Sequence, residues 1–321
     1  MNYIVLDLEW NQSATKKYQE KPELPFEIVE IGAIKLNETC EPIDTFHAII
    51  KPTVYPEMNS HIEQITHVHT EDLASGANFK QVASSFFDWC GTDYRFCTWG
   101  SMDLTELQRN MTYFHLPQTL EKPLFYYNIQ KLYSIQYSDG KTRVSLQNAV
   151  DALHIDKLIP FHRADADTYY TVMIMRILNM DQVKKNISID YYHPPASRKE
   201  EIYLTFDTYS KYVSRTFPTK EEVMEDKGVI TTSCYLCRKN IKKKIRWFSY
   251  NSRIYYSLMY CNTHGWIKGK IRIKKTDDGK LFAIKTLKIT DENGAEKIRH
   301  RQEEIRERRR HKRKANEQEN D

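Results

Sequence analysis

The sequence predicts an α/β protein in which a mixed β-sheet is flanked by helices and is followed by a small β module and a basic C-terminal tail. Three observations lead to this prediction: apolar strand-like segments come first, strand and helix patterns then alternate, and cysteines and lysines gather late in the chain. The 321 residues, 40% hydrophobic and 12% aromatic, suffice for one large domain and a smaller one.

Three segments near the N-terminus are predicted to be strands of a meander. Each is rich in apolar or β-branched residues and is bounded by Pro, Asn or Glu. They are residues 3–10 (YIVLDLEW), 27–37 (EIVEIGAIKLN) and 42–52 (PIDTFHAIIKP). A further short strand is expected at residues 94–100 (YRFCTWG).

Four segments carry the apolar spacing of helices that pack on such a sheet. They are residues 78–90, 103–114, 145–155 and 165–179. Ser145 is the expected N-cap of the third. Because strands come first and strand and helix then alternate, the helices should cover the faces of a mixed sheet.

Composition separates the chain into two halves of opposite charge. Residues 1–180 carry 15 basic against 23 acidic side chains, whereas residues 181–321 carry 33 against 20, giving −8 and +13. An acidic first half suits a carboxylate metal site, and a basic second half suits a polyanionic partner. The sequence shows neither a basic, apolar leader nor a long apolar run, so we expect a cytoplasmic protein that does not enter a membrane.

Carboxylates recur at the ends of the predicted elements. Asp7 and Glu9 lie two residues apart on a strand and therefore share one face, where their charges repel. Asp103 follows the short strand and begins a helix. A D-x-E pair alone also fits a solvated strand end. A bound cation would explain why the pair is tolerated.

His162 and Asp167 add a second pair of candidate residues. In a helix, residues i and i+5 lie about 140° apart, so the two side chains could not converge if both were helical. Pro160 disfavours helix just before it, which leaves His162 on a loop and Asp167 in the first turns of the following helix.

The order D-x-E, then Asp within WGSMD, then H-x4-D resembles the DEDDh 3′-to-5′ exonucleases of the ribonuclease-H-like group. The resemblance covers roughly residues 1–180. EIVEIGAIKL and DTFHAIIKP look like the family's second and third strands, and ITHVHTEDL looks like its turn. His67 stands in that turn where the family usually has Gly, near the terminal nucleotide in relatives.

The resemblance implies hydrolysis of phosphodiester bonds with two Mg²⁺ or Mn²⁺ ions, which prefer carboxylate oxygens. Asp7 would bridge the ions, Glu9 and Asp167 would hold the one that carries the attacking water, and Asp103 would support the other. His162 would be the general base. The four acids and His162 are thus the predicted catalytic residues, and Trp10 and His67 are predicted to contact nucleic acid.

We therefore expect a 3′-to-5′ exonuclease acting on 3′ ends of single-stranded nucleic acid. RNA is favoured because the strand and turn sequences look more like the RNA-trimming branch. Single-stranded DNA is the alternative substrate. A nucleic-acid-binding adaptor with an inactive nuclease fold is a further alternative, but its sign would be a lost ligand, and all five positions are filled.

We expect residues 181–226 to form a connector with a short helix capped by Thr219. A cysteine cluster lies beyond this connector. Cys234 and Cys237, then Cys261 and His264, form two knuckle-like pairs 23 residues apart, a spacing typical of a structural Zn²⁺ site of the zinc-ribbon kind. A buried thiol pair or a redox pair is the alternative. We assign this zinc-binding basic β module to residues 227–290.

The β module combines charge with aromatic side chains. Residues 231–290 contain 15 Lys or Arg against two acids, with Trp and Tyr among them, as in modules that bind single strands. A basic ribbon kept soluble by its lysines is the alternative.

In WIKGKIRIKK, a strand's period of two places four cations on one face and apolar residues on the other. The cations, which we call the cationic row, are Lys268, Lys270, Arg272 and Lys274. They should follow the phosphates of an extended strand, unless they protect an exposed sheet edge. The tail, residues 291–321, shows no apolar stripe and should be a frayed helix or disordered.

Overall fold

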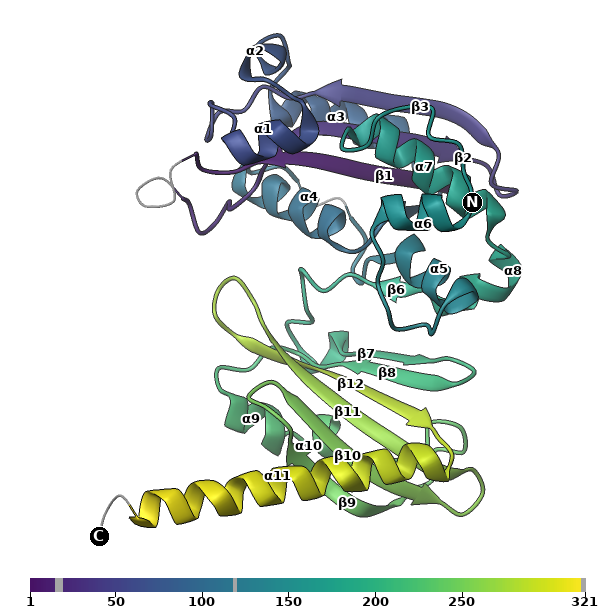
Figure 1. Cartoon of the computed structure of the whole chain (residues 1–321), viewed down its shortest axis with the longest axis vertical. Helices are drawn as coiled ribbons and strands as arrows, with labels where there is room; N and C mark the ends of the chain where they lie inside the picture. Colours follow the sequence, from purple (N-terminus) through teal and green to yellow (C-terminus); the bar gives the residue numbers. More distant parts are fainter. Residues whose placement is uncertain (15–19, 118–119, 319–321) are drawn as a thin grey trace. The chain divides into compact units, whose positions relative to one another are not determined.

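The computed structural model describes residues 1–14, 20–117 and 120–318, with side chains as far as residue 311 (Figure 1). Contacts divide the chain into two units, Met1–His193 and Pro194–Asp321. No helix in the described part of the chain combines the length and the apolar character that crossing a membrane requires.

The first unit is built on one sheet with the strand order β3-β2-β1-β4-β5-β6. β1 pairs antiparallel with β2 and parallel with β4, so the sheet is mixed, as predicted. Its strands are β1 (Asn2–Asn11), β2 (Glu27–Leu36), β3 (Pro42–Ile49), β4 (Tyr94–Thr98), β5 (Phe125–Asn128) and β6 (Ser188–Ile189).

Helices cover both faces of this sheet. They are α1 (Ser60–Thr66), α2 (Thr70–Leu73), α3 (Phe79–Cys90), α4 (Met102–Tyr113), α5 (Ile129–Tyr137), α6 (Leu146–Ala152), α7 (Ala164–Ile177) and α8 (Met180–Val183), followed by a 3₁₀ turn, η1 (Lys184–Asn186). Ser145 caps α6, as predicted, because its hydroxyl accepts the Asn148 amide at 3.2 Å.

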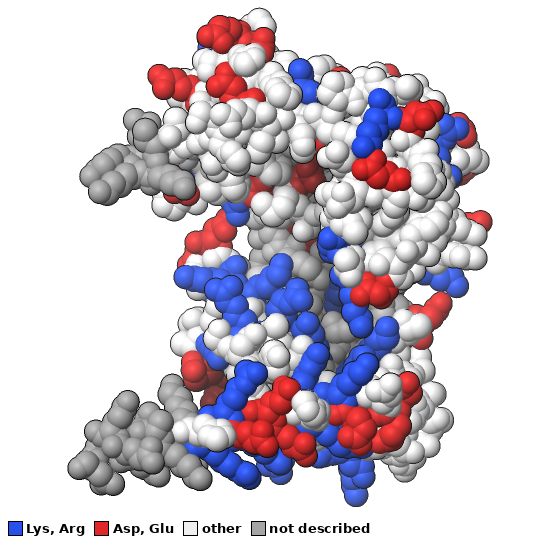
Figure 2. Space-filling model, viewed as in Figure 1, with Lys and Arg blue, Asp and Glu red and all other residues white. Residues whose placement is uncertain are grey.

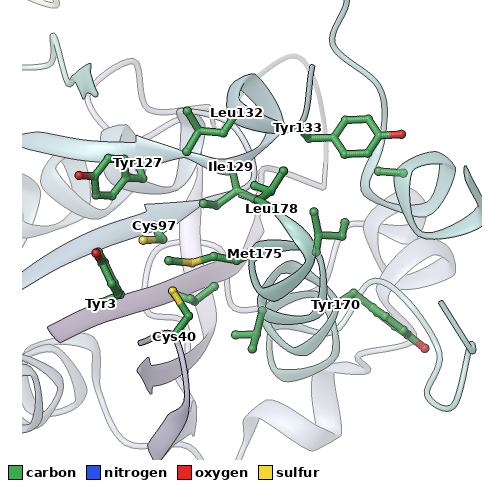
Figure 3. Packing of buried hydrophobic residues seen from close by; sticks show 14 of the residues in the cluster. Tyr3, Cys40, Cys97, Tyr127, Ile129, Leu132, Tyr133, Tyr170, Met175 and Leu178 are labelled. Atoms are coloured by element: carbon green, nitrogen blue, oxygen red, sulfur yellow. The ribbon is translucent and has the colours of Figure 1, made fainter. Parts of the chain in front are cut away.

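The alternating side chains of β1 separate two cores. Ile4, Leu6 and Leu8 pack with α3 and α4. Tyr3 and Val5 pack on the opposite face with α5, α6 and α7, in the cluster drawn in Figure 3. Asp7 and Glu9 continue this second face, so the sheet's period points both carboxylates toward the α7 side.

The second unit is a six-stranded antiparallel sheet with the order β7-β8-β12-β11-β10-β9. Its strands are β7 (Ile202–Thr205), β8 (Tyr209–Val213), β9 (Lys242–Ser249), β10 (Ile254–Cys261), β11 (Gly265–Lys275) and β12 (Leu281–Ile289). Its helices are η2 (Arg198–Glu200), α9 (Lys220–Glu225), α10 (Lys227–Ile230) and α11 (Glu292–Gln318). Thr219 caps α9, as predicted.

Residues 181–226, expected to be a connector, contribute strands to both sheets. β6 closes the first sheet, and the β7–β8 hairpin pairs with β12 in the second. The two prolines at 194 and 195 suggested a linker, but the residues that follow alternate apolar and polar side chains, which suits a hairpin.

One alternative and one expectation for the second unit are wrong. β11 lies between β10 and β12, so the cationic row does not guard a sheet edge. The segment after residue 291 is a helix with a short apolar stripe, because Ala295, Ile298 and Ile305 recur at helical spacing and are buried. Ala295 and Ile298 pack on Ile245 and Leu258 of the sheet.

Candidate active site

Two carboxylates at the end of β1 face two unusual residues of β2. In the antiparallel register, Asp7 lies opposite Gly32 and Glu9 lies opposite Glu30. Directly opposed residues share a face of the sheet, so three acidic side chains and one bare backbone position lie together.

Gly32 allows the N-terminus of α7 to lie directly on the sheet. A Cβ atom at Gly32 would come 2.2 Å from the carbonyl carbon and oxygen of Ala164, which is far inside van der Waals contact. The Thr168 hydroxyl donates to the Gly32 carbonyl at 2.9 Å. This close approach brings Asp167, in the first turn of α7, to Asp7 and Glu9, and ligand oxygens of the three acids lie within 4.8 Å of one another.

Asp103 joins this group from a third element. It occupies the first turn of α4, and only 5% of its surface is exposed. The backbone of Leu8 hydrogen-bonds to its carboxylate and so links α4 to β1 between Asp7 and Glu9. The structure therefore gathers all four predicted acids from β1, α4 and α7.

His162 lies on the loop before α7, as the position of Pro160 predicts. Its backbone has φ 68°, in the left-handed region, and its side chain is exposed. Its amide donates to Asp167 Oδ1 at 3.2 Å. The backbone amide of His162, the candidate base, is thus hydrogen-bonded to the carboxylate of Asp167, a candidate ligand.

Burial, with mutual repulsion as a further cause, raises the pKa values of the four acids. Burial, followed by the charge of Asp103, raises the pKa of Asp7 well above its ordinary value. Burial and the charge of Asp167 raise the pKa of Glu9 to about 8, and burial raises that of Asp103 to about 7. Burial also raises the pKa of Asp167. Divalent cations among these oxygens would relieve the repulsion, and hard oxygen donors suit Mg²⁺ or Mn²⁺.

The second unit holds a separate cluster that fits a different metal. Cys234 Sγ lies 3.4 Å from His264 Nδ1, Cys237 Sγ lies 3.7 Å from Cys261 Sγ, and the four ligand atoms lie within 4.8 Å of one another. Although burial opposes ionisation, backbone hydrogen bonds from Thr263 and His264 contribute to lowering the pKa of Cys261 to about 6, which favours the thiolate that zinc binds. The Cys3His donor set suits a structural Zn²⁺ ion.

The cationic row lies on one face of β11, as predicted. Lys268, Lys270 and Lys274 are partly exposed, Arg272 is exposed, and the alternate residues Ile267, Gly269, Ile271 and Ile273 are buried. Ile267 packs with the cysteine cluster, while Ile271 and Ile273 pack with α9 and α10. Figure 2 shows Lys and Arg side chains gathered over the strands of this unit.

The aromatic side chains expected to stack on bases are occupied by the protein itself. The Trp247 indole donates to the Ile230 carbonyl at 3.0 Å. Phe248 and Tyr256 pack against the start of α11, and the Arg301 guanidinium lies over the Tyr256 ring at 4.8 Å. The row of cations is therefore the stronger candidate for binding nucleic acid.

The structure does not bring the other predicted contacts, Trp10 and His67, into the acidic group. Trp10 lies on the opposite face of β1 from Glu9, packed with the α3 and α4 core and with Phe26 at 5.7 Å between ring centroids. His67 ends α1 with φ 55°, so the left-handed backbone that usually favours Gly is kept, and its imidazole is exposed.

Three residues beside the site escaped the sequence analysis: Gly32, Glu30 and Arg163. Glu30 stands between the buried apolar residues Val29 and Ile31 of β2, and a charge in such a place requires a partner. That position was a usable signal. The partner, Arg163, is 133 residues away and could not be identified from spacing.

Residues 4–175, more than half of the chain, match a protein-family model described as Exonuclease (RNase_T). The chain belongs to the exonuclease family. The matched range contains all five residues of the D-x-E, Asp and H-x4-D pattern, and the geometry above shows the acids converging. This exonuclease is accordingly a hydrolase of phosphodiester bonds.

Several solved structures resemble this exonuclease in part. The nuclease domain of 3′hExo, a DEDDh family member bound to rAMP, is 21% identical, with 59% of this chain and 96% of that chain covered and a TM-score of 0.49. Cell-death related nuclease 4 is 14% identical, with 62% of this chain and 73% of that chain covered and a TM-score of 0.48. E. coli ExoI in its zinc-bound complex with ssDNA is also 14% identical, with 57% of this chain and 41% of that chain covered and a TM-score of 0.46. Comparison with curated proteins gives no match.

Proposed function

We propose that this exonuclease removes nucleotides from the 3′ end of single-stranded nucleic acid with the help of two Mg²⁺ or Mn²⁺ ions. The observation that supports this proposal is the convergence of four carboxylates with raised pKa values from three separate elements. Unless cations share them, buried like charges at such distances oppose folding.

The chain's residues take complementary roles in this proposal. Asp7, Glu9, Asp103 and Asp167 hold the cations, which when bound activate water and stabilise the departing 3′ oxygen. Because it lies on an exposed loop tied to Asp167, His162 accepts the proton of the attacking water as general base.

We propose RNA as the preferred substrate, with single-stranded DNA as the alternative. The support is the likeness of EIVEIGAIKL and ITHVHTEDL to the RNA-trimming branch of the family. An adaptor with an inactive nuclease fold is disfavoured because the structure gathers all four acids and keeps His162 beside them.

In the second unit, we propose that the cysteine cluster holds one structural Zn²⁺ ion and that the cationic row binds the nucleic-acid backbone. The support is the Cys3His donor set and the four cations on one face of β11. Lysine and arginine recognise phosphates without reading bases, so this surface would serve substrates of any sequence.

The test is degradation of 5′-labelled RNA and DNA oligonucleotides with Mg²⁺, Mn²⁺ or EDTA. The proposal predicts a ladder of shortening products with either metal, none with EDTA, and faster decay of RNA. Asp167→Asn should abolish the ladder, whereas Asp165→Asn, on the exposed side of the same turn, should retain it. Activity lost only in Asp165→Asn would overturn the assignment of the site.

A further inference from the structure

Glu30 is a fully buried carboxylate whose charge is paired. Its side chain has 0% exposure. Arg163 donates to it through Nε, at 3.2 and 3.1 Å to the two oxygens, and through Nη2 at 2.9 Å. His47 Nε2, on the neighbouring strand β3, lies 2.6 Å from Oε1. We call Glu30, His47 and Arg163 the clamp.

The clamp differs chemically from the acids beside it. Glu30 lies opposite Glu9, on the same face of the sheet. Although burial would raise its pKa, the hydrogen bonds from His47 and Arg163 hold the pKa of Glu30 below its ordinary value. Burial and neighbouring charges raise the pKa values of the four predicted ligands instead. His47 and Arg163 hydrogen-bond to Glu30, so Glu30 is less free to bind a metal ion than the four predicted ligands, although a carboxylate oxygen of Asp165 also lies within 4.8 Å of Glu30 and His47.

The clamp acts on the loop that carries His162. Arg163 directly follows His162 and is the N-cap residue of α7, with extended backbone at φ −128° and ψ 136°. The His162 amide is held by Asp167 at 3.2 Å. Two contacts therefore hold His162 in its left-handed conformation. Its own amide is bound to Asp167, and the side chain of the next residue, Arg163, is bound to Glu30.

We propose that Glu30 is a positioning residue that holds the His162 loop in register with the four carboxylates through Arg163. This inference rests on the proposed role of His162 as general base. A bidentate Arg–carboxylate pair whose carboxylate is fully buried restricts both translation and rotation of the arginine, and His47 fixes the carboxylate itself. Because proton transfer depends on placement within about 1 Å, loosening the clamp should cost about 100-fold in rate.

The experiment compares the full chain with Glu30→Gln, Arg163→Gln and the double variant, assayed at 15 °C on an RNA oligonucleotide. The matched control is Arg176→Gln, which breaks an ion pair at the other end of the same helix, where Arg176 Nη2 donates to both oxygens of Glu41 at 3.1 and 2.9 Å. Each protein is measured for kcat, KM, half-saturating Mn²⁺ and thermal unfolding. His162→Ala is assayed alongside.

The proposal predicts that each single variant loses about 100-fold in kcat, with KM and half-saturating Mn²⁺ within about threefold of wild type. The double variant should be no slower than the slower single, because the two residues act as a unit. The control should keep wild-type kcat. A merely structural role would instead lower the unfolding temperature while leaving kcat of the folded fraction intact.

Three results would overturn the proposal. They are wild-type kcat in Glu30→Gln or Arg163→Gln, additive losses of kcat in the double variant, and a loss of kcat that comes with a higher half-saturating Mn²⁺ concentration. His162→Ala separates this failure from failure of the proposed function. If His162→Ala keeps wild-type kcat, the general-base assignment fails together with the inference. If it is inactive while Glu30→Gln is fully active, only the clamp fails.

Discussion

Replacing Glu9 by Gln should stabilise the metal-free protein at high pH. In the folded state burial and Asp167 raise the pKa of Glu9 from 4.5 to about 8. Below about pH 4.5 both folded and unfolded states carry the proton. Between pH 4.5 and 8 the unfolded state releases it while the folded state keeps it, so the free energy of unfolding falls as pH rises. Gln has no proton to release.

The size of the effect follows from the shift in pKa. A change from 4.5 to about 8 corresponds to an upper limit of about 5 kcal/mol, at about 1.4 kcal/mol per pKa unit. Solvent screening of the partly exposed side chain reduces it, so we expect about 2 to 4 kcal/mol. At pH 5, near the start of the titration, wild type and variant should differ little.

The assay is urea unfolding in EDTA at pH 5, 7 and 9. Taking the difference in the free energy of unfolding between wild type and Glu9→Gln cancels contributions from the second unit. Glu41→Gln is the control, since that carboxylate is 56% exposed in a surface ion pair worth less than about 1 kcal/mol. Adding Mn²⁺ at pH 9 should stabilise wild type more than Glu9→Gln. A difference between wild type and Glu9→Gln that does not grow from pH 5 to pH 9 would refute the raised pKa of Glu9.

Three other substitutions test separate parts of the structure. Gly32→Ala should lower the free energy of unfolding by about 1 to 3 kcal/mol or more and abolish activity, because a Cβ 2.2 Å from Ala164 displaces α7. A free energy of unfolding in urea near that of wild type would contradict the close approach. Cys237→Ser should remove about one zinc per chain and unfold the region around the cluster while nuclease activity persists, as measured by metal analysis and proteolysis; zinc-free wild type would count against the site. Changing Lys270 and Arg272 to Gln should make the slope of log K against log salt shallower by about 1.4, at about 0.7 per lost phosphate contact, with turnover of a saturating short substrate unchanged; an unaltered slope would remove the row from the binding surface.

Local patterns allowed the nuclease fold and five candidate active-site residues to be predicted. A strand's period places Asp7 and Glu9 on one face, and Pro160 separates the His162 loop from the helix of Asp167; both relations span only a few residues. The period of two also predicted which face of β11 carries the cations.

What could not be predicted depends on contacts between distant segments. The space beside Gly32 is closed only because α7 returns to β2 more than 130 residues later, and the pairing of Glu30 with Arg163 has the same cause. The internal position of β11 depends on its pairing with both β10 and β12. The β7–β8 hairpin, which extends the sheet beyond β12, was obscured by the prolines at 194 and 195. The short apolar stripe of α11 was hidden by the charges around it.

The way α11 is attached sets a limit on how much of it resists cleavage. Its first turns are anchored by Ala295 and Ile298, and Ile305 is its last buried side chain among the described residues, since 306–311 are all exposed. Beyond that point the helix relies on its own hydrogen bonds, which open readily in water. Amide hydrogen exchange should therefore be slow up to about Ile305 and fast after it. Brief treatment with trypsin should trim the arginine-rich end while the sheet survives as one fragment.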